Sequence, residues 1–311
     1  MRKMLFGCAG EVDAAGVNVT ASTQVGALCA FELAGFRRQQ LQPDLRQSAL
    51  METRIIACAL RGPGLPNWEA AAEILAGRVP YVACDAIEPA PAMLPPNERR
   101  RMSDTARWAL ATGHDALRAG SLADTDVATV FVSSGSDGSI TQQICEALAT
   151  PAREVSPTRF HNSVHNAPAG YWSIAMTSCA PSTSLCAGAG SFGAALLEAA
   201  AQALVDARPV LLIAYDLPYP EPLRAVWTLA DPFAVALLLA QPDTDVAGPR
   251  VRIELSSAPP GNDWPDALPR ELARNPAAAA LPLLAILARR DDGHVVLPFL
   301  DRCSIELEVT A

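Results

Sequence analysis

The sequence predicts an α/β fold with a mostly parallel sheet. Strand-like and helix-like segments alternate from residue 51 to about residue 241. Two of the strand segments, PVLLIAYD and DPFAVALLLAQ, are continuous apolar runs, which are typical of strands buried on both faces. The chain is 50% hydrophobic but only 5% aromatic, a composition that suits small helices packed closely on such a sheet.

The first fifty residues differ from the rest of the chain. They show no clear period beyond a short possible helix at Val25–Phe36. The strand pattern METRIIACALRGPG then begins abruptly at Met51 and ends in Gly and Pro. We therefore expect residues 1–50 to be an N-terminal extension, either disordered or an artefact of an upstream start codon.

The middle of the chain, residues 51–242, supplies most of the expected elements. Asn67 is expected to cap a helix that runs to Leu75. The segment PPNERRRMSDTARWALATGHDALRAG predicts one long amphipathic helix that ends near Gly120. A buried strand at Val127–Ser133 leads through a glycine-rich turn into a helix, and Asn162–Met176 predicts another helix.

The last part of the chain has a different pattern. PSTSLCAG predicts a strand, and Ser191–Asp206 predicts a helix of very small residues. Residues 243–311 form a C-terminal extension with a strand (VRIELSS), an apolar helix (AAAALPLLAILARR) and a β-hairpin (HVVLPFL and SIELEVT). The sequence leaves open whether this extension completes the sheet or forms a separate cap.

Composition excludes several classes of function. The formal net charge is −9 and no basic patch is visible, so no nucleic-acid partner is expected. The apolar stretches are too short or too interrupted to span a membrane, and no adequate apolar run follows the signal-like start MRKMLFGCAG. The eight cysteines form no CxxC pair, which argues against a metal site and predicts reduced thiols in a cytoplasmic protein. No cofactor is expected.

Two polar motifs have both a functional and a structural interpretation. SSGSDGSIT could hold a phosphate at a helix N-terminus, but it lacks a lysine and fits neither nucleotide-binding spacing, so a tight strand-to-helix turn is favoured. His161 and His165 lie four residues apart, which would place them on one face of a helix. No glutamate accompanies them in a metal-binding pattern, which favours a polar stripe at an interface or ordinary polar packing.

The stretch SLCAGAGSFG raises the question of a nucleophile. A strand enters it and a helix leaves it, and enzymes place reactive side chains at the tip of such a turn. The tip falls near Gly188–Ser191. Cys186 is expected to lie inside the strand as a buried, inert side chain, and Ser191 is expected to cap the helix.

Residues 129–216 resemble the N-terminal half of the β-ketoacyl synthases, condensing enzymes with the thiolase fold. VSSGSDGSITQQICEAL resembles their strand, glycine turn and helix, and Asn166–Gly170 resembles their interface helix. APSTSLCAGAGSFGAALLEAA resembles their GPS strand, nucleophile turn and small-residue helix. The likeness extends from Met51 to Gln241 and implies a thiolase-like half-domain of a condensing enzyme.

The resemblance also implies that the chemistry has been lost. Counting from Pro181–Ser182, the family's reactive cysteine falls on Ala189 or, with a one-residue gap, on Gly190. The family's two later histidines have no counterpart pair, since His294 alone follows the turn. This pattern is similar to a chain length factor of the aryl-polyene type, in which an active ketosynthase is the heterodimeric partner and meets the acyl carrier protein.

In this interpretation, the residues expected at the acyl tunnel and interface are His161, His165, Asn166, Pro168 and Trp172. The alternative is a divergent thiolase-fold acyltransferase that uses Cys186 or Ser191, with His161 or His165 as the base. A third possibility is a scaffold that binds an acyl carrier protein.

Overall fold

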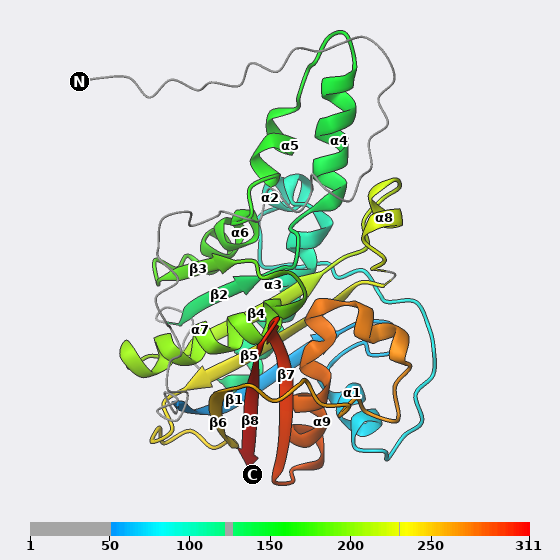
Figure 1. The fold of residues 1–311 in the computed structure, drawn as a ribbon. Helices are drawn as coiled ribbons and strands as arrows, with labels where there is room; N and C mark the ends of the chain where they lie inside the picture. The colour runs from blue at the N-terminus through cyan, green and yellow to red at the C-terminus, as the bar shows by residue number, and fades with distance from the viewer. Residues whose placement is uncertain (1–50, 122–126, 230) are drawn as a thin grey trace, which may run out of the picture. The chain divides into compact units, whose positions relative to one another are not determined.

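The computed structural model describes residues 51–121, 127–229 and 231–311 (Figure 1). The extension expected at residues 1–50, with its possible helix at Val25–Phe36, lies outside the described residues. The main elements, in chain order, are β1 (Met51–Arg61), α1 (Trp68–Leu75), α2 (Pro96–Arg101), α3 (Asp104–Gly120), β2 (Ala128–Val132), α4 (Gly138–Ala149), α5 (Pro157–Asn162), α6 (Ala167–Met176), β3 (Ser182–Leu185), α7 (Ser191–Val205), β4 (Val210–Asp216), α8 (Leu223–Val226), β5 (Phe233–Ala240), β6 (Arg250–Ser256), α9 (Leu281–Arg289), β7 (Gly293–Leu300) and β8 (Cys303–Thr310).

The strands form one mixed sheet in the order β3-β2-β4-β5-β1-β6-β8-β7. Among the strands of the described residues, only the β2–β3 and β2–β4 pairs are parallel. The pairs β4–β5, β5–β1, β1–β6, β6–β8 and β8–β7 are antiparallel. The expectation of a mostly parallel sheet is therefore wrong. A continuous apolar run indicates that a strand is buried on both faces, but it does not indicate the direction of the strand.

Helices cover both faces of the sheet. Leu211, Ile213 and Tyr215 of β4 pack with α3 and α6, whereas the alternate residues Leu212 and Ala214 pack on the side of α7. A second strand, β5, is buried along its whole length in the same way. These two central strands therefore carry the core on both sides, which explains their uninterrupted apolar sequences.

Local sequence signals account for several element boundaries. The Asn67 side chain accepts a hydrogen bond from the Ala70 amide at 2.9 Å, so the predicted cap of α1 is confirmed. The long helix predicted before Gly120 is two helices, because Met102 adopts an extended conformation and Ser103 caps a new start at α3. The segment predicted as one helix at Asn162–Met176 is also divided, with α5 ending at Asn162 and α6 beginning at Ala167.

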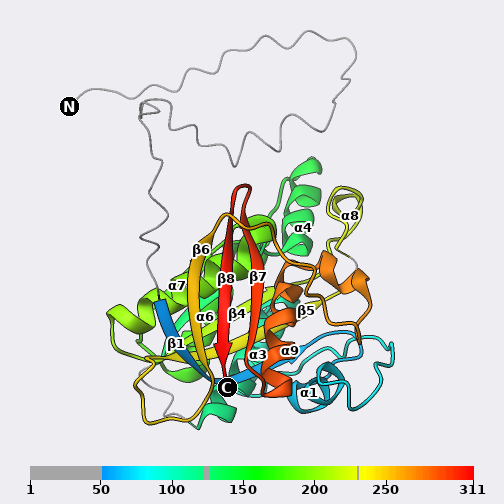
Figure 2. The ribbon, with the colours of Figure 1, turned by 60° about the horizontal axis from the view of Figure 1, so that its bottom comes forward.

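The C-terminal strands extend the sheet. β6 pairs with β1, and the predicted hairpin is confirmed as β7 and β8, which pair side by side next to β6 (Figure 2). The apolar segment before them forms α9, preceded by a short 3₁₀ turn at Pro276–Ala280, and its buried leucines join the α7 side of the core. Residues 250–256 and 293–310 thus lie in the same sheet as β1 through β5.

One apolar helical stretch of the described chain, Gly188–Val205, is long enough to cross a bilayer by length and composition. This differs from the sequence expectation that every apolar run is too short or interrupted. Half of the stretch is buried, and Phe192, Leu196 and Ala199 are fully enclosed in the core. Packing under the sheet accounts for its apolar composition.

Candidate functional site

The turn between β3 and α7 is a tight 3₁₀ turn at Gly188–Gly190. Gly188 has a φ of +54°, which strains any residue with a side chain, and so favours glycine at this point. Ser191 is 2% exposed, and its hydroxyl donates to the Gly188 carbonyl at 2.7 Å and accepts from the Ala187 amide at 3.0 Å. Ser191 therefore closes the turn through both bonds, instead of capping the amides of α7 as expected.

The backbone of β7 lies directly against this turn. A Cβ atom added to Gly190 would collide with the carbonyl oxygen of Phe299, and one added to Gly193 would come within 2.7 Å of the Pro298 oxygen. Ala189, in contrast, is exposed and lines a cleft of about 800 Å³ between the turn and the β7–β8 hairpin. Of the two positions expected for a nucleophile, only Ala189 has room for a reactive side chain.

Cys186 differs from its expected place. It follows the last residue of β3 and is exposed, and its thiol donates to the carbonyl of Ser134 at 3.0 Å. The expectation of a buried strand residue is wrong because β3 ends at Leu185, two residues before the strand end at Ala187 that the sequence predicted. The structure therefore brings Cys186 to the C-terminal ends of β2 and β3.

A buried carboxylate at the end of β4 was not identified from the sequence. One oxygen of Asp216, Oδ1, accepts three hydrogen bonds, from the Ser133 hydroxyl at 3.0 Å and from the Ser134 hydroxyl and amide at 2.8 Å each. Burial raises the pKa of Asp216 to about 6 even though these bonds favour the charged form. An aspartate directly after a fully apolar strand is the sequence signal that could have indicated it.

We predict that Asp216 makes the stability of the protein depend on pH. Because its pKa is raised in the folded state, its stabilising contribution is present below about pH 4 and is lost as the pH rises through about 6. The loss amounts to at most about 3 kcal/mol. Asp216→Asn keeps an oxygen for the three donors and stays neutral, so urea unfolding from pH 4 to 7.5 is expected to show a flatter profile than wild type.

Asp245→Asn is the matched control, because Asp245 is exposed. It is expected to retain the wild-type slope of unfolding free energy against pH. Equal slopes for Asp216→Asn and wild type would contradict the role assigned to this buried carboxylate.

The glycine-rich turn after β2 serves a structural purpose. Asp137 caps α4, with its side chain accepting from the Ile140 amide at 3.0 Å, so a carboxylate occupies the place of a bound anion. A Cβ added to Gly135 would collide with the hydroxyl of Tyr219, and one added to Gly138 would collide with its ring. The favoured interpretation as a strand-to-helix turn agrees with this packing, since Tyr219 fills the space beside the glycines.

The two histidines do not share a helix face. His161 lies on α5 and contacts the Tyr171 ring edge-on, with 5.8 Å between ring centres. His165 lies in the break before α6, and its Nε2 is 2.7 Å from the carbonyl oxygen of Leu185. The assumption of a single helix was wrong, because the helix ends at Asn162, whose side-chain amide donates to the Arg101 carbonyl at 2.6 Å.

The expected tunnel and interface residues of α6 divide into buried and exposed groups. Pro168 and Trp172 are buried, and Trp172 packs edge-on against Phe131 of β2 with ring centres 6.2 Å apart. Asn166 is exposed, and so are Gly170 and Ile174, each one turn further along the helix. The outer face of α6 is therefore formed by Asn166, Gly170 and Ile174.

Exposed apolar side chains lie close to this face in the sequence. Phe160, Val164 and Ile174 are 66%, 46% and 53% exposed, respectively. We call the set Phe160, Val164, Asn166, Gly170 and Ile174 the α5–α6 face. Helix α6 contacts β3, which is an edge strand of the sheet. Large exposed apolar side chains near an unpaired strand edge are typical of a surface that contacts another chain.

Within the described ranges, no three His, Cys, Asp or Glu side chains come together in a way that could hold a metal ion. The six cysteines described there are free thiols.

Residues 72–292 match the family described as "Beta-ketoacyl synthase, N-terminal domain". A search of curated proteins gives no match. Among solved structures, the chain is similar to one from "Ketosynthase (ApeO) in Complex with its Chain Length Factor (ApeC) from Xenorhabdus doucetiae", at 26% identity and a TM-score of 0.62, covering 83% of this chain and 99% of that one.

Two further structures share the fold at lower identity. "The ishigamide ketosynthase/chain length factor" matches at 14% identity with a TM-score of 0.62, covering 83% of this chain and 99% of that one. The complex AntDE:AntF, a type II acyl-carrier protein with its ketosynthase, matches at 10% identity with a TM-score of 0.66, covering 84% and 99%. These likenesses show an α/β thiolase-like ketosynthase fold with a mixed sheet.

Proposed function

The chain belongs to the β-ketoacyl synthase N-terminal domain family, and we propose that it is a non-catalytic member, a chain length factor that pairs with an active ketosynthase. The observation that carries the proposal is the turn at Gly188–Gly190, which has no nucleophile. Ala189 has no reactive group, and a side chain at Gly190 would collide with β7. Acyl transfer needs a thiol or hydroxyl at this place, activated by a nearby base.

The other candidate nucleophiles give little support to catalysis by this chain. The Ser191 hydroxyl is buried and holds the turn through two hydrogen bonds. The Cys186 thiol donates to a backbone carbonyl and has no imidazole among its hydrogen-bond partners in the described chain. His165 bonds a backbone carbonyl, and His294 bonds Glu306 at 2.7 Å.

The sheet edge supports a heterodimer. The Thr129 amide of β2 donates to the Pro181 carbonyl at 3.0 Å, so the backbone groups of Pro181 face β2. The backbone groups of successive residues in a parallel strand point to opposite sides, so those of every second residue face away from β2. The outward-facing backbone groups of β3 are therefore those of Ser182 and Ser184. A partner strand could pair with them while its helices cover the α5–α6 face.

In the proposed complex the reaction takes place on the partner. The thiolate of the partner's cysteine attacks the carbonyl of an acyl thioester, and the carrier's thiol leaves as the acyl–enzyme forms. This chain contributes a wall to the acyl tunnel through the α5–α6 face. The similar solved structures are ketosynthases with a chain length factor or an acyl carrier protein, which supports this assignment.

Co-expression with ketosynthases of aryl-polyene systems tests the proposal. We expect a stable one-to-one complex by size-exclusion chromatography. After incubation with an acyl thioester, intact mass measurement is expected to show the acyl group on the ketosynthase and none on this chain. A covalent acyl group on Cys186 or Ser191 would contradict the proposal and favour the acyltransferase alternative.

A further inference from the structure

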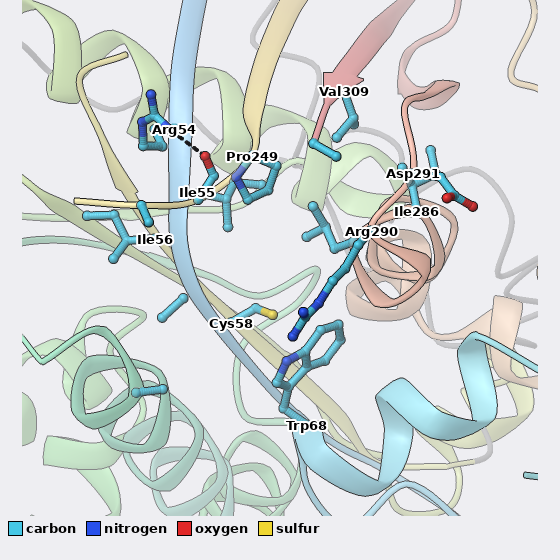
Figure 3. Close-up of a pocket in the computed structure, with 16 residues that line it drawn as sticks. Arg54, Ile55, Ile56, Cys58, Trp68, Pro249, Ile286, Arg290, Asp291 and Val309 are labelled. Atoms are coloured by element: carbon cyan, nitrogen blue, oxygen red, sulfur yellow. Dashed lines mark hydrogen bonds between the residues drawn. The ribbon is translucent and has the colours of Figure 1, made fainter. Parts of the chain in front are cut away.

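A cavity of about 750 Å³ lies beside β1 (Figure 3), and none of the residues of the turn or of the α5–α6 face lines it. Its walls come from β1, α1, the end of α3, α9, the loop before β6 and the C-terminal end of β8. Strand β1 is four places from β3 in the sheet, which corresponds to about 19 Å. The cavity therefore lies outside the surface that the proposed function uses.

The cavity exists because β6 separates from β1. The two strands pair only from Met51 to Arg54, and one further bond joins the Ile55 amide to the Pro249 carbonyl at 3.0 Å. Beyond this point the pairing of β1 with β5 has a register irregularity between Ile55 and Ala57, and no strand of the described residues pairs with the other side of β1 there. The cavity occupies the space that a continued β6 would fill.

Most of its walls are apolar. Trp68 of α1 and Ile286 of α9 line the cavity, and Cys58 of β1 lies at its base (Figure 3). Burial raises the pKa of the Cys58 thiol far above its ordinary value, so the floor of the cavity carries no charge from this thiol at neutral pH. A volume of this size with apolar walls and few polar groups is typical of a small-molecule site.

One cation that lines the cavity is available, the exposed residue Arg290. The side chain of Arg290 points inward, toward Trp68 and Cys58 (Figure 3), and among the described residues it has no hydrogen bond or ion pair. Arg54 is already engaged, with its guanidinium donating to the Pro242 carbonyl at 3.0 Å and also to the Gly248 carbonyl. Arg290 is therefore the group that can bind a ligand anion.

Within the described residues, no acidic side chain forms an ion pair with Arg290. Asp291 lines the cavity, but its carboxylate is directed away from Arg290 (Figure 3) and lies 3.8 Å from the guanidinium of Arg289. The C-terminal residue Ala311 is held by a bond from its amide to Asp292 at 2.9 Å. Arg290 itself adopts a φ of +58° at the end of α9, a position that glycine would occupy with less backbone strain.

We infer that this cavity binds a carboxylate with an unbranched apolar tail of medium length. The carboxylate pairs with the Arg290 guanidinium by charge-assisted hydrogen bonds, while the tail lies against Trp68 and Ile286. The inference goes beyond the proposed function, because it needs neither a partner chain nor an active turn.

Isothermal titration of the full chain with decanoate, octanoate and decanol tests this assignment. Each pair of methylenes is expected to change affinity by roughly tenfold, so decanoate binds more tightly than octanoate. Arg290→Gln is expected to weaken decanoate binding by about tenfold or more, and to leave the weaker decanol binding unchanged. Ala119→Trp, at an exposed position that lines the cavity, is expected to abolish binding of all three compounds.

Arg289→Gln is the matched control. Arg289 is the neighbouring arginine, but it does not line the cavity. Its replacement is therefore expected to leave decanoate affinity unchanged. Absence of decanoate binding to wild type would overturn the inference. So would equal loss for Arg289→Gln and Arg290→Gln, or binding that Ala119→Trp does not reduce, since either result would indicate nonspecific association.

Discussion

Replacing Ser184 with proline is expected to abolish assembly with the partner ketosynthase and to leave the fold intact. The Ser184 amide faces away from β2, so proline removes a hydrogen-bond donor from the outer edge of the sheet and none from its interior. Its ring also obstructs an incoming strand. A loss of about 3 kcal/mol of binding free energy corresponds to a weakening of the affinity for the partner by more than 100-fold, which co-purification and analytical ultracentrifugation would detect.

Ser184→Ala provides the matched control for this experiment. It removes the hydroxyl but keeps the backbone amide, so the complex is expected to form as in wild type. The thermal stability of both variants, measured on the isolated chain, should stay close to wild type. A complex that survives Ser184→Pro would contradict pairing through β3.

Trp172→Ala is expected to destabilise the isolated chain by about 3–5 kcal/mol. Trp172 is 4% exposed and packs between Phe131 of β2 and Gly113 of α3, where the helix backbone comes close to the indole. Deletion of the indole leaves a cavity that the sheet and two helices cannot close. Urea unfolding measures the loss directly, and a change below about 1 kcal/mol would contradict this packing.

Gly170→Leu is the companion variant on the exposed side of the same helix. A Cβ at Gly170 meets no atom within 4 Å, and a leucine is a better helix former by up to about 1 kcal/mol. We therefore expect no loss of stability. In the assembled complex the added side chain would narrow the proposed tunnel, so the product distribution should shift to shorter chains. Gly170→Leu is expected to change product length more than Trp172→Ala does.

Short-range signals predicted the parts of the fold that depend on neighbouring residues. Asn67 marks the start of α1 because its side chain bonds an amide three residues later. The β7–β8 hairpin was recognisable because two alternating segments flank a two-residue connection at Asp301–Arg302. The break between α2 and α3 was missed, although Ser103 is a typical N-cap.

The candidate site was predictable only in outline. The residues of the turn could be read from the sequence, and so could the missing nucleophile implied by the family resemblance. The sequence could not reveal that Phe299 packs on Gly190, because the two residues are more than one hundred positions apart. It also could not divide α6 into the buried Trp172 and the exposed Gly170, since both belong to one small, apolar helix with little amphipathic character.

The sequence by itself determined where most strands and helices lie, and that the turn at Gly188–Gly190, which the family resemblance relates to a nucleophile turn, contains only glycine and alanine. The tertiary structure alone decided the strand directions, the burial of Asp216 beside two serines, and the cavity with the inward-pointing Arg290. The reason is physical. Hydrophobic periods and caps act over a few residues, whereas strand direction, buried charge and cavities depend on contacts between segments that the sequence keeps far apart.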